Sequence, residues 1–256
     1  MKTLLLGIGA LRAGTTWLFD YLSRHPQVHG GPIKAFHFWD EWFRNDGASW
    51  RRHLESSLPG AGPQRRMAIA ERLKIIEPAD YFAHFDRHSG DKPYVLDMTS
   101  TYALMSAARF EAIARHANAA GYQVQVVYVL RDPIEHHRSV ISHLATTQRG
   151  SRDFVSSLET PVADHSRYHR TLSAVITVFP GTIVGFFEST IVPGDPEAVM
   201  MALGLPPLRV PDDLRRHRSE QLVDLADEDI AAGMRAFMPA YEFVGDLYRK
   251  PPSWRA

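Results

Sequence analysis

The segment with the most potential for chemistry is a short turn that combines glycine, two threonines and an arginine. It runs from Arg12 to Trp17 as RAGTTW and follows the apolar stretch Leu4–Ile8. An apolar strand that leads through such a turn into a helix is the usual form of a phosphate cradle, because the first N–H groups of the helix point at the anion. We predict that backbone N–H groups and threonine hydroxyls bind a phosphate along Ala13, Gly14, Thr15, Thr16 and Trp17.

This turn departs from the common nucleotide-binding pattern at one position. From Gly9 the sequence nearly matches G-x-x-x-x-G-K-[ST], but Thr15 stands where that pattern has lysine. Because the lysine contacts the β- and γ-phosphates, its absence argues against an ordinary nucleotide kinase or triphosphatase. A cation is present three positions earlier as Arg12, whose guanidinium can bind two phosphate oxygens at once. The alternative is a helix cap that binds no ligand.

A second polar turn follows the apolar run Val124–Leu130. Asp132 is a good N-cap and Pro133 suits the first helical position, so Arg131 lies at the carboxyl end of a strand. Ser139 then falls about two turns into the following helix. Alone, this turn is a common capping device; beside the first cradle it is a candidate for a second phosphate.

Strand-like and helical patterns alternate along the chain. We expect strands at 3–8, 94–97, 124–130 and 182–187, and helices at 16–23, 103–119, 133–143, 168–179 and 196–203. This alternation predicts an α/β fold, a P-loop-like three-layer arrangement with a central, mainly parallel sheet flanked by helices. Because ligands bind beyond the carboxyl ends of such strands, we expect the loop after Ile8, Asp97 and the turn Arg131–Asp132 at one edge.

Composition limits the class of protein. The 256 residues are 45% hydrophobic and 23% charged, which suits one globular domain spanning residues 1–256. Basic and acidic residues both number 29, so net charge gives no reason to expect a nucleic-acid partner. Cysteine is absent, which fits a reducing cytoplasm, and no apolar stretch reaches the roughly 20 residues of a membrane span. Nothing in the sequence indicates the oligomeric state.

Two further regions have less specific patterns. Residues 34–79 are rich in aromatic side chains and arginine without a strand pattern, which predicts helices and loops over the sheet, either a substrate lid or a plain helical insertion. Residues 224–248 predict one or two amphipathic helices packed on the core. The adjacent residues His136 and His137 point about 100° apart on a helix and cannot readily share a metal ion. No other spaced histidine cluster is evident, so we expect no metal.

Together, the two polar turns resemble those of a known family. Residues 12–18 are similar to the 5′-phosphosulfate loop of sulfotransferases that use 3′-phosphoadenosine 5′-phosphosulfate (PAPS), and the spacing from Arg131 to Ser139 matches the pair that holds the donor's 3′-phosphate. Residues 185–188 and 203–205 resemble the late strand and helix of the same family. The chain looks closest to the branch that contains heparan sulfate sulfotransferase domains and many bacterial sulfotransferases.

The resemblance implies roles for individual residues. Gly14 to Trp17 would hold the 5′-phosphosulfate, and Arg131 and Ser139 the 3′-phosphate. The basic run at 215–218, with Arg216 and Arg218, falls where the family often closes a loop over the nucleotide; the alternative is a solvated charged turn. No metal is implied.

Sulfuryl transfer moves SO₃ from a phosphate oxygen to a hydroxyl or amine, and negative charge develops on the leaving phosphate. A cation and oriented N–H groups lower that barrier electrostatically. Most members of the family use a loop lysine where this chain has Arg12. Because arginine does not readily give up its proton, we expect Arg12 to stabilise charge and not to act as an acid.

The acceptor's proton requires a base, and here the sequence departs from the family. The related branch has a glutamate after a lysine, in a motif like Lys-Glu-x-His-Phe, whereas this chain has Ala35 between Lys34 and Phe36. Three explanations remain open: a replacement of the glutamate that traps a complex, a base role for His37, or a base role for Asp97. A histidine beside aromatic residues is otherwise often only a packed side chain, and a carboxylate at a strand end can simply cap a helix.

The acceptor is not identified by the sequence beyond a small molecule or saccharide. Aromatic residues from Phe36 to Trp50 either line a pocket or form core, and the arginines at 44, 51, 52, 65 and 66 either bind a sulfated saccharide or are surface charge. The alternatives to catalysis by this chain are a homologue that binds donor without turnover and, less favoured by Thr15, a nucleotide kinase.

Overall fold

A computed structural model describes residues 1–45, 48–147, 153–214 and 222–255. Its centre is a five-stranded, entirely parallel sheet in the order β2-β3-β1-β4-β5. The strands are β1 (Lys2–Gly9), β2 (Val28–His29), β3 (Tyr94–Met98), β4 (Tyr122–Leu130) and β5 (Ile183–Phe186). The predicted α/β fold with a parallel central sheet is confirmed, with one short edge strand, β2, that the sequence analysis missed.

Burial explains why the central strands form. The side chains of Leu4, Leu5, Leu6 and Ile8 in β1 are fully buried. In β4, Val126 to Leu130 are at most 1% exposed. Such unbroken apolar runs suit strands that are covered on both faces, because alternate side chains point to opposite sides of the sheet. The carboxyl ends of β1 and β4 are thereby fixed side by side.

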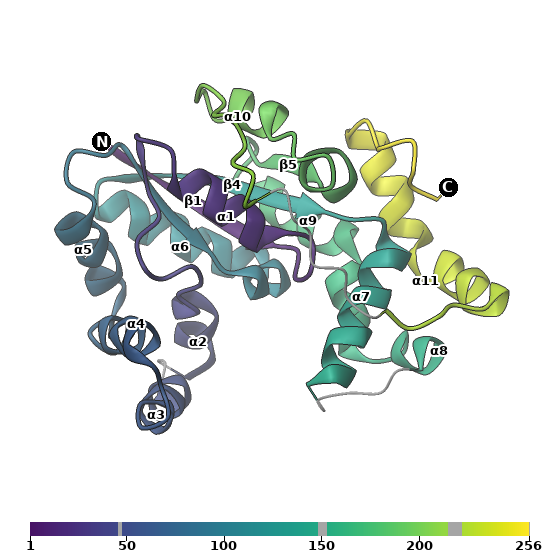
Figure 1. Cartoon of the computed structure of the whole chain (residues 1–256), viewed down its shortest axis with the longest axis horizontal. Coiled ribbons are helices and arrows are strands. Elements are labelled where there is room, and N and C mark those ends of the chain that lie inside the picture. Colours follow the sequence, from purple (N-terminus) through teal and green to yellow (C-terminus); the bar gives the residue numbers. More distant parts are fainter. Residues whose placement is uncertain (46–47, 148–152, 215–221, 256) are drawn as a thin grey trace.

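Helices cover both faces of this sheet. Figure 1 shows α1 (Thr15–Ser23) on one face, while α6 (Ala107–Ala119) and α9 (Tyr168–Val178) pack together on the other. The other helices outside residues 38–88 are α7 (Pro133–Thr146), α8 (Phe154–Ser157), α10 (Glu197–Ala202) and α11 (Asp227–Leu247). Short 3₁₀ turns at Ser100–Leu104 (η1) and Pro161–Ser166 (η2) and a π turn at Phe187–Ile191 (η3) complete it.

One helix prediction was wrong at its start. The sequence analysis joined residues 103–119 into a single helix, whereas the structure has η1, a break and then α6 from Ala107. The break occurs because Met105 and Ser106 are extended, with ψ angles of 148° and 162°. The C-terminal prediction resolves to a single helix, α11, which continues through Pro239.

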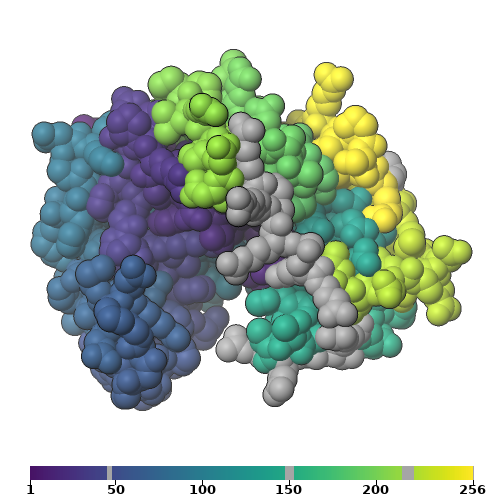
Figure 2. Space-filling view, in the orientation of Figure 1, coloured from purple at the N-terminus to yellow at the C-terminus, as the bar shows by residue number. Residues whose placement is uncertain are grey.

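Residues 38–88 form a helical insertion at one end of the sheet. Its helices are α2 (Phe38–Asn45), α3 (Ala48–Ser57), α4 (Pro63–Leu73) and α5 (Pro78–His88), and no strand is found in its described residues. Phe36, Phe38 and Trp39 are buried in the main core, whereas Trp42 and Trp50 are half-buried. Part of the aromatic run is therefore core. Figure 2 shows a notch between this insertion and the region of α7 and α8.

No helix in the described part of the chain is both long enough and apolar enough to cross a membrane.

Candidate phosphate-binding site

The turn after β1 presents a bare helix N-terminus. Gly14, the N-cap of α1, has φ 82° and ψ 17°, the left-handed conformation that favours glycine. A Cβ added there would lie 2.8 Å from the side chain of Ile191, so space also requires glycine. No side chain caps α1, and its first turn holds no acidic residue. The N–H groups at this end are therefore available to an anion.

The two polar turns meet in one cleft of about 890 Å³. Both predicted groups of phosphate ligands are on its wall, except Ala13, which is fully buried behind the loop. The wall also holds Asp20, Lys34, Ser100 and Phe187. The parallel pairing of β1 with β4 explains this meeting, since both turns leave the carboxyl edge of neighbouring strands. The predicted ligands on the wall are Arg12, Gly14, Thr15, Thr16, Trp17, Arg131 and Ser139.

Two arginines bring positive charge into this cleft. Burial lowers the pKa of both the Arg12 and the Arg131 guanidinium, and the charge of Arg131 lowers the pKa of Arg12 further. The Arg131 guanidinium lies 4.6 Å from the centre of the Phe187 ring, and no ion pair of Arg131 occurs within the described residues. Neighbouring like charges repel, so this arrangement favours an anion between them.

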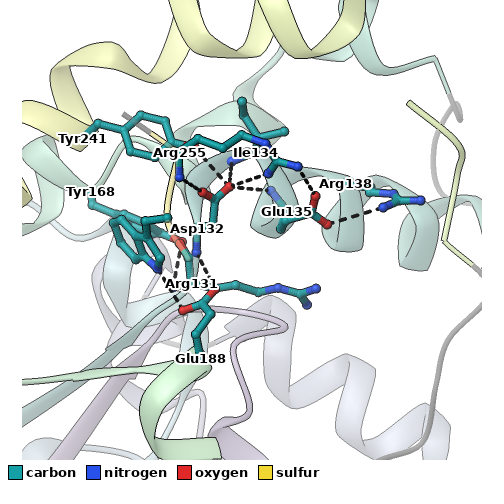
Figure 3. A network of polar contacts seen from close by, with 10 residues as sticks. Arg131, Asp132, Ile134, Glu135, Arg138, Tyr168, Glu188, Tyr241 and Arg255 are labelled. Atoms are coloured by element: carbon teal, nitrogen blue, oxygen red, sulfur yellow. Dashed lines mark hydrogen bonds and ion pairs between the residues drawn. The ribbon is translucent and has the colours of Figure 1, made fainter. Parts of the chain in front are cut away.

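Asp132 forms no ion pair with Arg131 among the described residues, because its carboxylate faces the opposite way. Figure 3 shows the Arg131 guanidinium directed away from the network around Asp132. The Asp132 side chain accepts hydrogen bonds from the N–H groups of Ile134 and Glu135, both at 3.1 Å, and from the Tyr241 hydroxyl at 3.0 Å. Its carboxylate also pairs with Arg255 at 3.2 Å.

Glu188 fixes the same turn from another element. Its Oε1 accepts from the Asp132 N–H at 2.9 Å, and its Oε2 accepts from the Trp254 indole at 2.8 Å. With these carboxylates engaged, Arg131 and the nearly buried Ser139 remain directed at the cleft. The Ser139 hydroxyl has no hydrogen-bond partner in the part of the chain that the structure describes.

A sulfotransferase family model matches residues 5–185, which include both turns. The chain belongs to the sulfotransferase family. A sulfotransferase from Alicyclobacillus acidocaldarius shares the fold with a TM-score of 0.67 at 19% identity, over 100% of this chain and 99% of that one. The sulfotransferase domain of the Synechococcus PCC 7002 olefin synthase has a TM-score of 0.50 at 15% identity, covering 98% and 95%. No curated protein matches significantly.

This sulfotransferase has a second cation at its candidate phosphate loop, one that the sequence analysis did not assign. The Nζ of Lys34 lies 3.4 Å from the Thr15 hydroxyl, and Lys34 lines the cleft. Burial lowers the pKa of Lys34, an effect that the nearby carboxylate of Asp20 partly offsets. Sequence spacing gave no signal for this contact, because it depends on how the chain after β2 runs past the carboxyl end of β3, where the Lys34 carbonyl accepts from the Met98 N–H at 2.9 Å.

The segment after Lys34 lies beside the cleft, and neither Ala35 nor His37 is on its wall. The Ala35 carbonyl accepts a 2.5 Å hydrogen bond from Arg72 of α4. His37 has a φ of 54°, an uncommon value for this residue, and its Nδ1 lies 3.2 Å from both Asp40 Oδ2 and Thr101 Oγ1. Because Thr101 donates to Asp40 at 2.6 Å, Asp40 accepts from both neighbours when Nδ1 carries the proton.

Asp97 is enclosed and does not reach the cleft. It is fully buried and accepts from the hydroxyls of Thr99, Tyr81 and Tyr102 at 2.6, 2.8 and 3.0 Å, and from the N–H of Phe36 at 3.4 Å. Burial raises the pKa of Asp97, and these donors oppose that rise. This geometry favours a positioning role over a base role, because Asp97 holds the segment that contains Ala35 and His37.

Replacement of Asp97 by alanine should therefore reduce stability. Three hydroxyl donors would lose their buried acceptor, and we expect unfolding to become easier by about 3 kcal/mol, measured by urea denaturation. The matched control is Asp91→Ala, whose carboxylate is exposed and should change stability by less than about 0.5 kcal/mol. If both variants unfolded at the same urea concentration, the positioning role of Asp97 would be contradicted.

The basic run with Arg216 and Arg218 lies outside the described residues. Leu214 and Leu222, which flank the run, both line the cleft. The Leu214 carbonyl also accepts from the Trp17 indole at 2.7 Å, and the Trp17 ring stacks on Tyr21. These contacts join the chain near residue 214 to the phosphate loop.

Proposed function

We propose that this sulfotransferase transfers a sulfuryl group from PAPS to a hydroxyl or amine of a small-molecule or saccharide acceptor. The proposal is supported by two candidate anion sites in one cleft, one at the N-terminus of α1 with Arg12 and one at Arg131 and Ser139. PAPS has phosphate at both its 5′ and 3′ positions, so it suits two separate sites. The phosphates of ATP all extend from one end.

In the proposed reaction, the bond between sulfur and the phosphate oxygen breaks as the acceptor oxygen or nitrogen bonds to sulfur. Negative charge passes to the leaving 5′-phosphate, beside the N–H groups of α1, Arg12 and Lys34. Fixed donors and cations at that point stabilise the transition state more than the ground state. The acceptor's proton must pass to a base.

For that base we propose His37, as a less effective substitute for the glutamate that is absent at position 35, because His37 is not on the wall of the cleft. When Nδ1 carries the proton and directs it at Asp40, Nε2 has a lone pair that can accept a proton. In the same way, a carboxylate orients the histidine of a catalytic triad.

A second candidate function, donor binding without turnover, is favoured by Ala35 at the position of the family's glutamate. The Lys34-Ala35-Phe36-His37-Phe38 segment is also the basis on which we place the chain near the heparan sulfate branch.

Calorimetry with 3′-phosphoadenosine 5′-phosphate (PAP), ATP and AMP tests the donor site. We expect PAP to bind at least tenfold more tightly than ATP. Arg131→Ala should weaken the affinity for PAP by about 100-fold, which is the effect of losing a charge-assisted pair. The affinity for AMP should stay nearly unchanged, because AMP lacks the 3′-phosphate.

The matched control is Arg115→Ala, which removes an exposed arginine on α6 and should leave the affinity for PAP unchanged. Tighter binding of ATP than of PAP would exclude a PAPS donor site. If Arg131→Ala lost PAP affinity and AMP affinity equally, Arg131 would not be the residue that binds the 3′-phosphate.

A further inference from the structure

Three metal-ligating side chains converge on the insertion, away from the cleft. Glu71 of α4 and His84 and His88 of α5 place one ligand atom each within 4.8 Å of the others. Glu71 Oε2 lies 3.7 Å from His84 Nδ1 and 3.9 Å from His88 Nε2. The two histidines are four residues apart, so they share one face of α5, and their ring centres are 4.4 Å apart.

Hydrogen bonds orient two of these ligands. His88 Nδ1 lies 2.7 Å from the carbonyl of His84 and therefore donates its proton there, which leaves the lone pair of Nε2 facing Glu71. Glu71 Oε1 is taken by Lys74 at 2.5 Å, which leaves Oε2 for the two histidines. A histidine whose other nitrogen donates to a carbonyl is the usual arrangement around a bound metal.

His84 supplies an independent sign that a ligand is required. Its side chain is 3% exposed, and its Nδ1 is buried without a hydrogen-bond partner. The carboxylate of Glu71 is the group nearest to that nitrogen among the contacts of His84, but it stands too far away for a hydrogen bond. A buried polar atom without a partner is costly, and a metal ion between His84 and Glu71 would satisfy it.

We propose that Glu71, His84 and His88 bind one divalent transition-metal ion, with Zn²⁺ as the best match. Two imidazoles and a carboxylate are a set that zinc binds, whereas Ca²⁺ and Mg²⁺ require oxygen ligands. Ligands held tetrahedrally at about 2.0–2.2 Å from zinc stand roughly 3.3 Å apart. The two Glu71–histidine separations of 3.7 and 3.9 Å need only a small contraction, and the two histidine nitrogens, which lie within 4.8 Å of each other, must also move closer. His88 is 39% exposed, which leaves an entry path and a position for water.

Such an ion would have a structural role. It would join α4 to α5 immediately beside Arg72, which holds the Ala35 carbonyl, and beside Phe36, whose ring lies 5.3 Å from that of His84. None of its three ligands lines the cleft. The inference therefore does not rest on the proposed donor or reaction, and its failure would leave both untouched.

The test uses tag-free, full-length protein that has been stripped with a chelator and dialysed. Titration with ZnCl₂ should show one site per chain with micromolar or tighter affinity, and saturation should raise Tm by about 5 °C. Co²⁺ should give the intense visible spectrum of a tetrahedral site. Ca²⁺ and Mg²⁺ should produce neither effect.

The decisive variant is His88→Gln, because this partly exposed side chain can be changed without disturbing the core. We expect zinc affinity to fall at least about 100-fold and the tetrahedral Co²⁺ spectrum to disappear. The control is His53→Gln, an exposed histidine on α3, which should bind zinc as the wild type does. Equal zinc binding by wild type and His88→Gln, or weak binding at several sites per chain, would show surface binding only and overturn the proposal.

Discussion

Replacement of Ala35 by glutamate is expected to raise the rate of sulfate transfer from PAPS by about 10²–10⁴-fold, the usual contribution of a general base. Position 35 follows Lys34, whose Nζ reaches the phosphate loop at Thr15. Its backbone is fixed by the hydrogen bond from Arg72, and its side chain is half-buried, so a longer side chain has room toward solvent. Ala35 itself is not on the cleft wall, so the longer side chain of glutamate is what would bring a carboxylate toward the proposed reaction site.

The matched control is Ala35→Gln, which has the same size and can accept hydrogen bonds but cannot take a proton at neutral pH. Release of PAP from PAPS in the presence of phenol, amine and saccharide acceptors measures all three proteins. Both variants should bind PAP as the wild type does. A gain of less than tenfold for Ala35→Glu with intact PAP binding would show that no base is missing at position 35.

The same assay separates the two candidate functions. If His37 is the base of the native chain, His37→Gln should abolish the measurable native rate, and Ala35→Glu should restore transfer in that background. If the native chain only binds donor, the wild type and His37→Gln should both be inactive, and only the proteins that carry the Ala35→Glu substitution should turn over.

The sheet could be predicted because its signal is local. In β1 and β4, unbroken apolar runs are long enough to mark a buried strand by themselves. The edge strand β2 has only Val28 and His29, too few residues for any periodic pattern. The break before α6 was missed because Met105 and Ser106 differ from helical residues in backbone angles and not in type.

The position of the two polar turns could also be predicted, since each turn is contiguous in sequence and follows a strand. The surroundings of the turns depend on distant segments. Lys34 reaches Thr15 only because the chain after β2 passes the carboxyl end of β3, where the Lys34 carbonyl accepts from the Met98 N–H. Likewise, Asp97 was expected at the sheet edge as a possible base, but Tyr81 of α5 and Tyr102 of η1 close over it. No local pattern shows that an insertion will bury a carboxylate.

The proposed metal ligands combine a local sequence pattern with a contact that depends on tertiary packing. The spacing of His84 and His88 on one helix is visible in the sequence, but the sequence analysis did not single out this pair. Glu71 joins them only through the packing of α4 against α5, which no spacing rule contains.

Removal of the Arg12 guanidinium is expected to lower kcat by about 10²–10³-fold, the loss typical of a donor aimed at developing charge. Arg12 lines the cleft near the N-terminus of α1, where the leaving phosphate of the proposed reaction would gain its charge. We expect Arg12→Met to show this loss, with a smaller change in the KM for PAPS. Arg12→Lys should retain most activity, because it keeps the charge and adds an ammonium that can give up a proton.

The contrast with Arg131 makes this prediction specific. Arg131 is proposed to hold the 3′-phosphate, which carries the same charge before and after transfer, so Arg131→Ala should raise the KM for PAPS and leave kcat nearly unchanged. Steady-state kinetics of both variants, in the Ala35→Glu background if the native rate is too low, measures the two parameters. If Arg12→Met raised KM alone, Arg12 would bind the donor equally in the ground and transition states. The charge on the leaving phosphate would then be stabilised by the α1 N–H groups and Lys34.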